Sequence, residues 1–236
     1  MLLEETLKKI KPLDKSAMKS ASKRWDSIAK PLHSLGKMED LVIQIAGIEG
    51  TADVSIGKRA LVVMCADNGV VEEGVTQTGQ EVTAIVARNF LKGDTSACVM
   101  CRQCHTDVFP VDVGMVVDTE VPTDLKVTMG TRNMTKGPAM TKEEAVKGLE
   151  AGVEMVVRLK EKGYNLLATG EMGIGNTTTS SAVASVLLDE PVEKMTGRGA
   201  GLSSGGLLRK IEAIHRAIEI NRPDPSDPID VLAKVG

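Results

Sequence analysis

Apolar residues in the first fifty positions recur at the spacing of an α-helix. They run through Leu3, Leu7 and Ile10, and resume at Met18, Trp25, Ile28 and Leu32. Residues three or four positions apart lie on one face of a helix, so this pattern predicts helices with one apolar side. A turn at residues 33–36 separates them from a second amphipathic stretch that ends near Ile48. We expect residues 1–50 to form a small helical domain.

From residue 59 the pattern changes to short, continuous apolar runs. Such runs are typical of strands that are buried on both faces of a parallel sheet. The runs are RALVVMCA at 59–66, VFPVDVG at 108–114 and LLAT at 166–169. Glycine ends or closely follows each of them, beside a polar or acidic residue. Because ligands bind beyond the carboxyl ends of parallel strands, we expect the functional residues at these positions.

Helical patterns lie between these runs, at 80–92, 94–105 and 141–162. The last of them begins with Thr141 and Glu144, which have the spacing of a capping box. Strands that alternate with helices predict βαβ units and a parallel sheet with flanking helices. The segment NRPDPSDPID at 221–230 predicts a connector that contains a helix N-cap. We therefore expect an α/β domain over residues 51–236.

Composition narrows the class of protein. A net charge of −3, with 42% apolar and 26% charged residues, is ordinary for a globular chain. This charge and the scarcity of aromatic residues (one Trp, one Tyr and two Phe) argue against nucleic-acid binding. The sequence has no signal-peptide pattern and no apolar run of about 18 residues. We expect a cytoplasmic protein that does not bind membranes, whose four cysteines are thiols.

The segment TGEMGIGNTTT at 169–179 is the strongest candidate for an anion site. Its glycines allow the backbone to approach a ligand closely, and the helix expected after it presents free N–H groups. The side chains of Asn176, Thr177 and Thr178 add hydrogen-bond donors. The alternative interpretation is a tight turn between strand and helix, in which Asn176 or Thr177 is a simple N-cap.

A second glycine-rich segment, TGRGAGLSSG at 196–205, leads into a helix that carries Lys210. It is either a flexible loop or a second contact to the same anion. Glu171, between glycines at the end of a strand, can bind ribose hydroxyls, stabilise developing positive charge or take a proton, and is equally suited to a solvated turn. For Asp67 and Asp112, at the ends of the other two strands, we favour the capping of turns.

Three cysteines, Cys98, Cys101 and Cys104, are spaced like part of an iron–sulfur motif, and Cys101 to His105 also match the haem attachment pattern CxxCH. Both interpretations lack support, since there is neither a fourth nearby cysteine nor an export signal. Spacing of three also places the cysteines on one face of the expected helix, where cysteine packs as a small apolar residue. We predict a packed face without metal. We expect surface or capping roles for His33 and His215.

Five segments together resemble the nicotinate-nucleotide–dimethylbenzimidazole phosphoribosyltransferases. They occur in the order of that family: KPLHSLGKMEDL (30–41), VMCADNGVVEEGVTQTGQEVT (63–83), GEMGIGNTTTS (170–180), GRGAGL (197–202) and NRPDPSDPIDVLAKVG (221–236). The resemblance implies a Rossmann-like α/β domain and a small helical domain built from both chain ends, assembled as a homodimer. It implies no metal and no organic cofactor.

The activity implied by the resemblance is the transfer of phosphoribose from nicotinate mononucleotide to 5,6-dimethylbenzimidazole or a similar base. The products would be α-ribazole phosphate and nicotinate, in the assembly of cobalamin. The residues that the family motifs assign to the nucleotide are Glu171, Gly173, Gly175, Asn176, Thr177 and Thr178, with Gly199, Ala200 and Lys210 at its phosphate. Thr78 would lie near the aromatic base. Which base is preferred is left open.

The resemblance assigns no catalytic residue to these 236 residues. Family members are longer, and their general base is a glutamate in a glycine-rich motif of the C-terminal third, which has no counterpart here. A shortened chain, a natural fragment and a second polypeptide that supplies the rest are all compatible with this; we favour the first. Two functions therefore remain open: an enzyme of this family, represented by its nucleotide-binding part, and a non-catalytic nucleotide-binding module.

Overall fold

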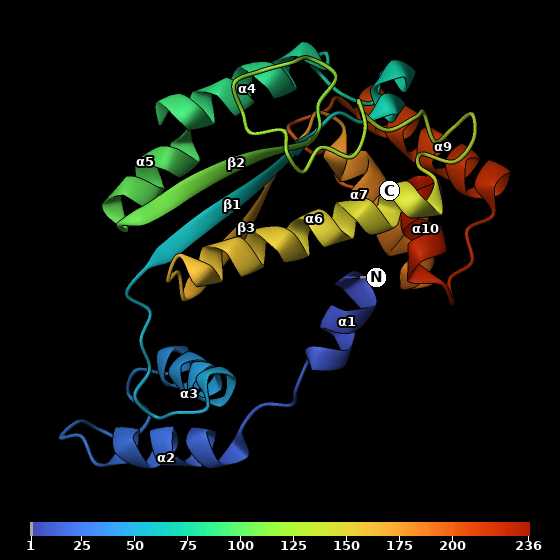
Figure 1. Cartoon of the computed structure of the whole chain (residues 1–236). Helices are drawn as coiled ribbons and strands as arrows, with labels where there is room; N and C mark the ends of the chain where they lie inside the picture. Colours follow the sequence, from blue (N-terminus) through green and yellow to red (C-terminus); the bar gives the residue numbers. More distant parts are fainter. Residues whose placement is uncertain (1) are drawn as a thin grey trace. The chain divides into compact units, whose positions relative to one another are not determined.

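A computed structural model describes residues 2–236 of the chain and divides them into two units, one ending at Lys58 and the other comprising Arg59–Gly236 (Figure 1). Residues 51–58, the last of the first unit, form neither helix nor strand. The predicted boundary after residue 50 falls at the start of this segment. That boundary, eight residues before the division at Lys58, stays a prediction.

The first unit is helical, as the periodicity predicts. It contains α1 (Leu2–Lys9), α2 (Lys15–Asp26) and α3 (Lys37–Glu49). Asp14 starts α2 by accepting hydrogen bonds from the N–H groups of Ser16 and Ala17 (2.8 and 3.0 Å). The buried carboxylate of Glu39 accepts hydrogen bonds from Lys30 Nζ (2.7 Å) and from the Leu35 N–H (3.1 Å). These contacts fix the turn that precedes α3.

The second unit is built on a parallel sheet with the strand order β2-β1-β3. Its strands are β1 (Arg59–Ala66), β2 (Thr106–Gly114) and β3 (Leu166–Met172). Cys65 of β1 lies opposite both Asp112 and Met172, so all three strands end at one edge of the sheet. The predicted parallel sheet and the order of its elements are confirmed.

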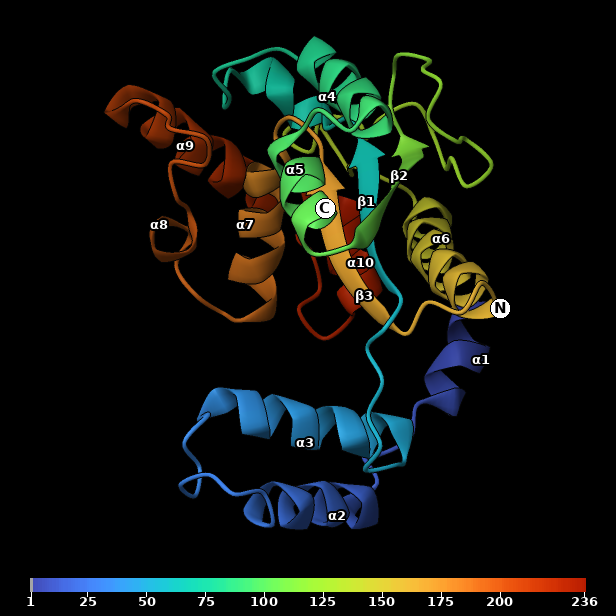
Figure 2. The same cartoon turned by 90° about the vertical axis from the view of Figure 1, so that its left-hand side faces the viewer.

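Helices cover both faces of this sheet (Figure 2). α4 (Glu81–Lys92) and α5 (Ser96–Gln103) lie on one face, where residues such as Val63, Cys65 and Ala87 are buried. α6 (Lys142–Glu161) lies on the other and packs Met155 and Leu159 against Ala60 and Val62. Alternate residues of β1 therefore belong to two different cores.

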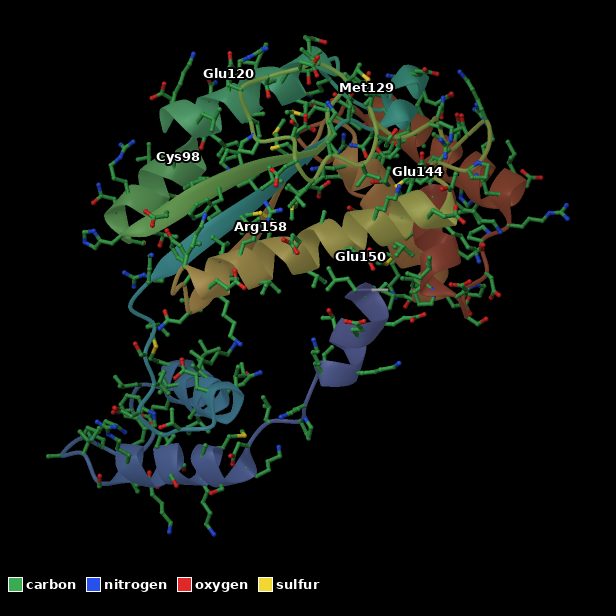
Figure 3. The ribbon with its side chains drawn as sticks, in the orientation of Figure 1. Cys98, Glu120, Met129, Glu144, Glu150 and Arg158 are labelled. Carbon is green, nitrogen blue, oxygen red and sulfur yellow. The ribbon has the colours of Figure 1, made fainter. Side chains whose placement is uncertain are left out.

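The capping box expected at the start of α6 is present. The Thr141 hydroxyl accepts a hydrogen bond from the Glu144 N–H (3.1 Å), and the Glu144 carboxylate accepts one from the Thr141 N–H (2.7 Å). Figure 3 labels Glu144 at this end of α6 and Arg158 near the other end. The helix therefore begins at the position that its sequence predicts.

A third core lies among the C-terminal helices. These are α7 (Asn176–Leu187), the short α8 (Val192–Met195), α9 (Ser204–Asn221) and α10 (Pro228–Val235). Ala182, Ile214 and Val231, from three of them, are fully buried and pack with Val70 of the 3₁₀ helix η1 (Gly69–Glu73), which follows β1. The predicted N-cap of the connector is Asp227, which accepts hydrogen bonds from two N–H groups of α10.

The prediction for the third strand was wrong in one respect. β3 extends three residues beyond the predicted run, and several of its residues are exposed, Leu166 to 38%. The reason is its place in the sheet: among the described strands β3 pairs with β1 alone, so its other edge has no neighbour. A continuous apolar run does not distinguish a central strand from an edge strand.

None of the helices in the described part of the chain combines the length and apolarity that a membrane crossing requires.

Candidate functional site

Three loops of the second unit line one pocket at the carboxyl end of the sheet, with a volume of about 140 Å³. They are residues 75–78 after η1, residues 173–177 between β3 and α7, and residues 198–202 before α9. Of the residues predicted to bind substrate, Thr78, Gly173, Gly175, Asn176, Thr177, Gly199 and Ala200 all line this pocket. The structure thus brings residues 75–78 together with two loops that begin about 95 and 120 residues further along the chain.

The loop before α7 requires glycine at both of its ends. A Cβ atom at Gly173 would lie 2.3 Å from the carbonyl oxygen of Ala66 at the end of β1. Gly175 has φ +92°, in the left-handed region that side chains other than glycine rarely adopt. Gly175 is the N-cap, and α7 begins at Asn176. The alternative in which Asn176 or Thr177 is the N-cap is therefore wrong, and both belong to the first turn of the helix.

Lys210 connects the two glycine-rich loops. It lies on α9 with 1% of its surface exposed, and its Nζ donates hydrogen bonds to Thr177 Oγ1 (2.8 Å) and to the Gly197 carbonyl (3.2 Å). Among the described residues, no carboxylate forms an ion pair with it, and burial lowers its pKa. A buried ammonium group without a counter-ion is costly unless an anion binds beside it. The backbone at Gly199 is close by, since a Cβ there would lie 3.6 Å from Nζ.

The other three residues predicted to bind substrate, Glu171, Thr178 and Lys210, do not line the pocket, although Lys210 is hydrogen-bonded to Thr177, which does. The Glu171 residue is exposed at the end of β3, yet desolvation by the surrounding protein raises the pKa of its carboxyl, and a hydrogen bond with Asn176 partly offsets this. Thr178 is fully buried, and its hydroxyl has no hydrogen-bond partner among the described residues. For ligand contact, Thr178 would have to move, whereas Glu171 is accessible.

Among the polar residues of the pocket that were not singled out from the sequence, Gln77 and Arg198 hold the loops in place. The Gln77 side chain donates a hydrogen bond to the Gly201 carbonyl, which joins the first loop to the third. Arg198 donates to the Leu202 carbonyl (2.8 Å) and to the Ser204 hydroxyl (3.1 Å), which closes the third loop on itself. Both lie inside segments that carry the family resemblance, but nothing in their spacing indicates these contacts.

The two aspartates at the other strand ends cap turns, as expected. Asp112 Oδ1 accepts hydrogen bonds from the N–H groups of Gly114 (2.9 Å) and Met115 (2.7 Å). Asp67 Oδ2 accepts one from the Val116 N–H (2.8 Å). Both aspartates are almost completely buried, so their role is to hold the loops that leave β1 and β2.

The cysteine-rich face of α5 is only partly packed. Cys98, labelled in Figure 3, is buried and Cys101 half-buried, as predicted, but Cys104 is exposed. Cys104 is the C-cap residue, beyond the last helical residue Gln103, so it does not lie on the packed face of the helix. In residues 2–236, no three His, Cys, Asp or Glu side chains are grouped so as to hold a metal ion. The absence of metal stays a prediction.

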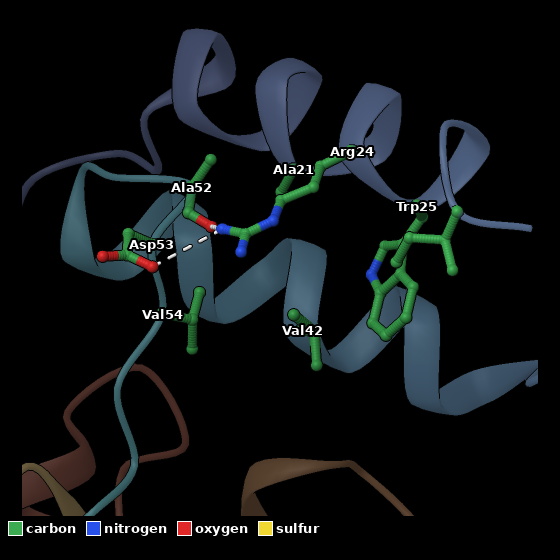
Figure 4. Close-up of a pocket in the computed structure, with 8 residues that line it drawn as sticks. Ala21, Arg24, Trp25, Val42, Ala52, Asp53 and Val54 are labelled. Atoms are coloured by element: carbon green, nitrogen blue, oxygen red, sulfur yellow. Dashed lines mark hydrogen bonds and ion pairs between the residues drawn. The ribbon is translucent and has the colours of Figure 1, made fainter.

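A second cavity, of about 250 Å³, lies within the helical unit (Figure 4). It is lined by Trp25, Val42 and Val54, with Arg24 donating a hydrogen bond to Asp53 (3.5 Å) at one side. Its walls are mainly apolar, and its one ion pair is internal and largely exposed to solvent. It offers no unpaired charge to a phosphate.

The pocket in the second unit therefore defines a class of protein. A glycine loop at the end of a parallel strand, a helix N-terminus and a buried lysine without a counter-ion together make an α/β binding site for a phosphorylated ligand. Comparison with known proteins is more specific. Residues 10–236 match a family model described as phosphoribosyltransferase. The chain belongs to this phosphoribosyltransferase family, and the resemblance drawn from its motifs is confirmed.

Similar proteins carry a common name. A nicotinate-nucleotide–dimethylbenzimidazole phosphoribosyltransferase of Ruminiclostridium cellulolyticum is 53% identical over 238 residues, and one of Acetivibrio thermocellus is 50% identical over 237. Each alignment covers 100% of this chain and 68% of the relative. The crystal structure of CobT from Thermus thermophilus superposes with a TM-score of 0.87 at 40% identity, covering 94% of this chain and 67% of that one.

Proposed function

We propose that this chain provides the nucleotide-binding part of an enzyme that transfers phosphoribose from nicotinate mononucleotide to 5,6-dimethylbenzimidazole or a similar base. The products are α-ribazole phosphate and nicotinate. The observation that carries the proposal is Lys210: a buried ammonium group, hydrogen-bonded to both glycine-rich loops, that pairs with no carboxylate of residues 2–236. The names of its relatives support the choice of substrates.

Each part of the pocket has a role in this proposal. The first turn of α7 and the backbone at Gly199 and Ala200 receive the phosphate, with Lys210 supplying positive charge. Glu171, at the end of β3, faces the ribose, and Thr78 contacts the base. Nicotinate leaves the same carbon, C1′, that the incoming base attacks. Positioning of the two bases and stabilisation of positive charge on the ribose therefore dominate the rate.

A ligand-bound crystal structure tests the placement. We expect the phosphate of nicotinate mononucleotide between residues 173–178 and 197–201, because the helix N-terminus and the lysine converge there. A phosphate bound elsewhere in the molecule would contradict the proposal.

We also infer, from the family resemblance, that the protein is a homodimer and works in the cytoplasm. The mass of the protein in solution tests the dimer.

One observation favours a second candidate function. No Asp or Glu is present among the residues that line the pocket in the described part of the chain. With no carboxylate lining the pocket, and with Glu171 beside it assigned to the ribose, the pocket can bind a nucleotide but has no group assigned to take up the proton. The alternative is therefore a non-catalytic nucleotide-binding module.

A further inference from the structure

The loop between β3 and α7 is held at its centre by side chains from two other elements. The Ile174 N–H donates a hydrogen bond to Thr83 Oγ1 (3.1 Å), and the Ile174 carbonyl accepts one from Asn68 Nδ2 (3.0 Å). Thr83 lies on α4, and Asn68 follows β1. Both polar groups of one residue are thus fixed from outside the loop, which restrains the peptide planes on either side of it.

The two side chains are themselves well anchored. Thr83 is fully buried, and Asn68 is 8% exposed. The backbone carbonyl of Asn68 accepts a further hydrogen bond from Gln80 Nε2 (3.0 Å). The residue that holds the loop is therefore itself fixed by α4's neighbouring residue Gln80. Buried polar groups are costly without partners, and these two find partners in the backbone of Ile174.

The loop needs such support because its ends are glycines. Gly173 and Gly175 have no side chains that could anchor the backbone, and glycine loses more conformational freedom on ordering than any other residue. If the nucleotide had to order this loop on binding, the entropy lost by the loop would reduce its affinity. Neither Asn68 nor Thr83 lines the pocket, and the side-chain atoms that face the loop, Asn68 Nδ2 and Thr83 Oγ1, are bound to the backbone of Ile174.

We propose that Asn68 and Thr83 are positioning residues, which hold the Gly173–Gly175 loop so that the first turn of α7 faces the phosphate of the nucleotide. This inference rests on the proposed function and adds to it the residues that prepare the site before the ligand arrives. Their contribution is to affinity for the nucleotide, through the loop, and not to affinity for the aromatic base.

The test is Thr83→Val, which keeps the shape of the side chain and removes the hydroxyl acceptor. We expect calorimetry to show about three- to tenfold weaker binding of nicotinate mononucleotide, the effect of one lost hydrogen bond, with unchanged binding of dimethylbenzimidazole. Hydrogen exchange of the Ile174 amide, measured without ligand, should become faster. Thr83→Ser, which retains the hydroxyl, should restore most of the affinity and of the amide protection.

Thr135→Val is the matched control. Thr135 is also buried, and its hydroxyl donates to Glu73 (2.8 Å), outside the pocket, so this variant should lose stability but keep its affinity for the nucleotide. If Thr83→Val does not fold, Asn68→Ala removes the other hydrogen bond to Ile174, the one that its carbonyl accepts. Wild-type affinity and wild-type exchange at Ile174 in the variant that folds, Thr83→Val or else Asn68→Ala, would overturn the positioning role alone. If the wild-type chain bound no nucleotide, the proposed function itself would fail.

Discussion

Replacing Lys210 by alanine should weaken the binding of nicotinate mononucleotide about ten- to a hundredfold. A hydrogen bond between a charged group and phosphate contributes about 1.5–3 kcal/mol. The lysine is already desolvated and already held by Thr177 Oγ1 and the Gly197 carbonyl, so little is spent on ordering it when the ligand binds. Titration calorimetry with nicotinate mononucleotide and with dimethylbenzimidazole measures both affinities, and only the first should fall.

The pH dependence of nucleotide binding distinguishes the charge of Lys210 from its structural role in holding the two loops. Burial lowers the pKa of Lys210 from the ordinary value of 10.5, and the ammonium form, which attracts phosphate, exists only below that pKa. Affinity should therefore decline as the pH rises through the lowered pKa of Lys210, at a pH below 10.5. Lys210→Ala should lack this decline.

Arg216→Ala is the matched control on the same helix. Arg216 is half exposed and pairs with Glu73 (3.1 Å) away from the pocket, so its removal changes the net charge equally. Nicotinate mononucleotide should bind this variant as it binds the wild type. Equal affinity of wild type and Lys210→Ala would remove Lys210 from the site.

Local patterns in the sequence predict this site better than they predict the contacts that hold it together. Gly173 and Gly175 stand out because two glycines soon after an apolar run are typical of a close-packed turn from strand to helix, and the structure places Gly173 against the end of β1. The contacts of Ile174 with Asn68 and Thr83 have no local signal, because they join residues 106 and 91 positions apart. Side chains that meet only through the tertiary fold cannot be paired from one sequence.

The exposure of β3 is likewise a feature of the fold that its own residues do not predict. LLAT predicts a strand whether that strand is central or at an edge, since the apolar run records propensity and not the number of neighbours. The start of α7 is a different case. Asn176 and Thr177 are good N-cap residues, but the left-handed backbone of Gly175 starts the helix one residue earlier. Here the conformation that only glycine adopts readily overrides a side-chain preference.

The largest effect concerns catalysis. A base that attacks C1′ must lose a proton, and a positioned carboxylate contributes about 10²–10⁴-fold to such a step. No carboxylate lines the pocket in the described part of the chain, and Glu171 lies beside it, hydrogen-bonded with Asn176 and close to where the ribose is proposed to bind. We therefore expect the 236-residue chain alone to bind nicotinate mononucleotide weakly and to form little or no α-ribazole phosphate.

A chimaera restores what the pocket lacks. When the C-terminal part of the Ruminiclostridium cellulolyticum relative follows Gly236, transfer to dimethylbenzimidazole should rise by at least the factor that a general base contributes, about 10²-fold. The 53% identity between the two proteins favours a compatible interface. Chromatography detects the product, and the chimaera with Lys210→Ala is the control, in which the added segment is intact and the phosphate contact is missing. If the isolated chain instead made product at an ordinary enzymatic rate and Glu171→Gln abolished it, then Glu171, whose pKa desolvation already raises, would be the base, and the division of roles proposed for this pocket would be wrong.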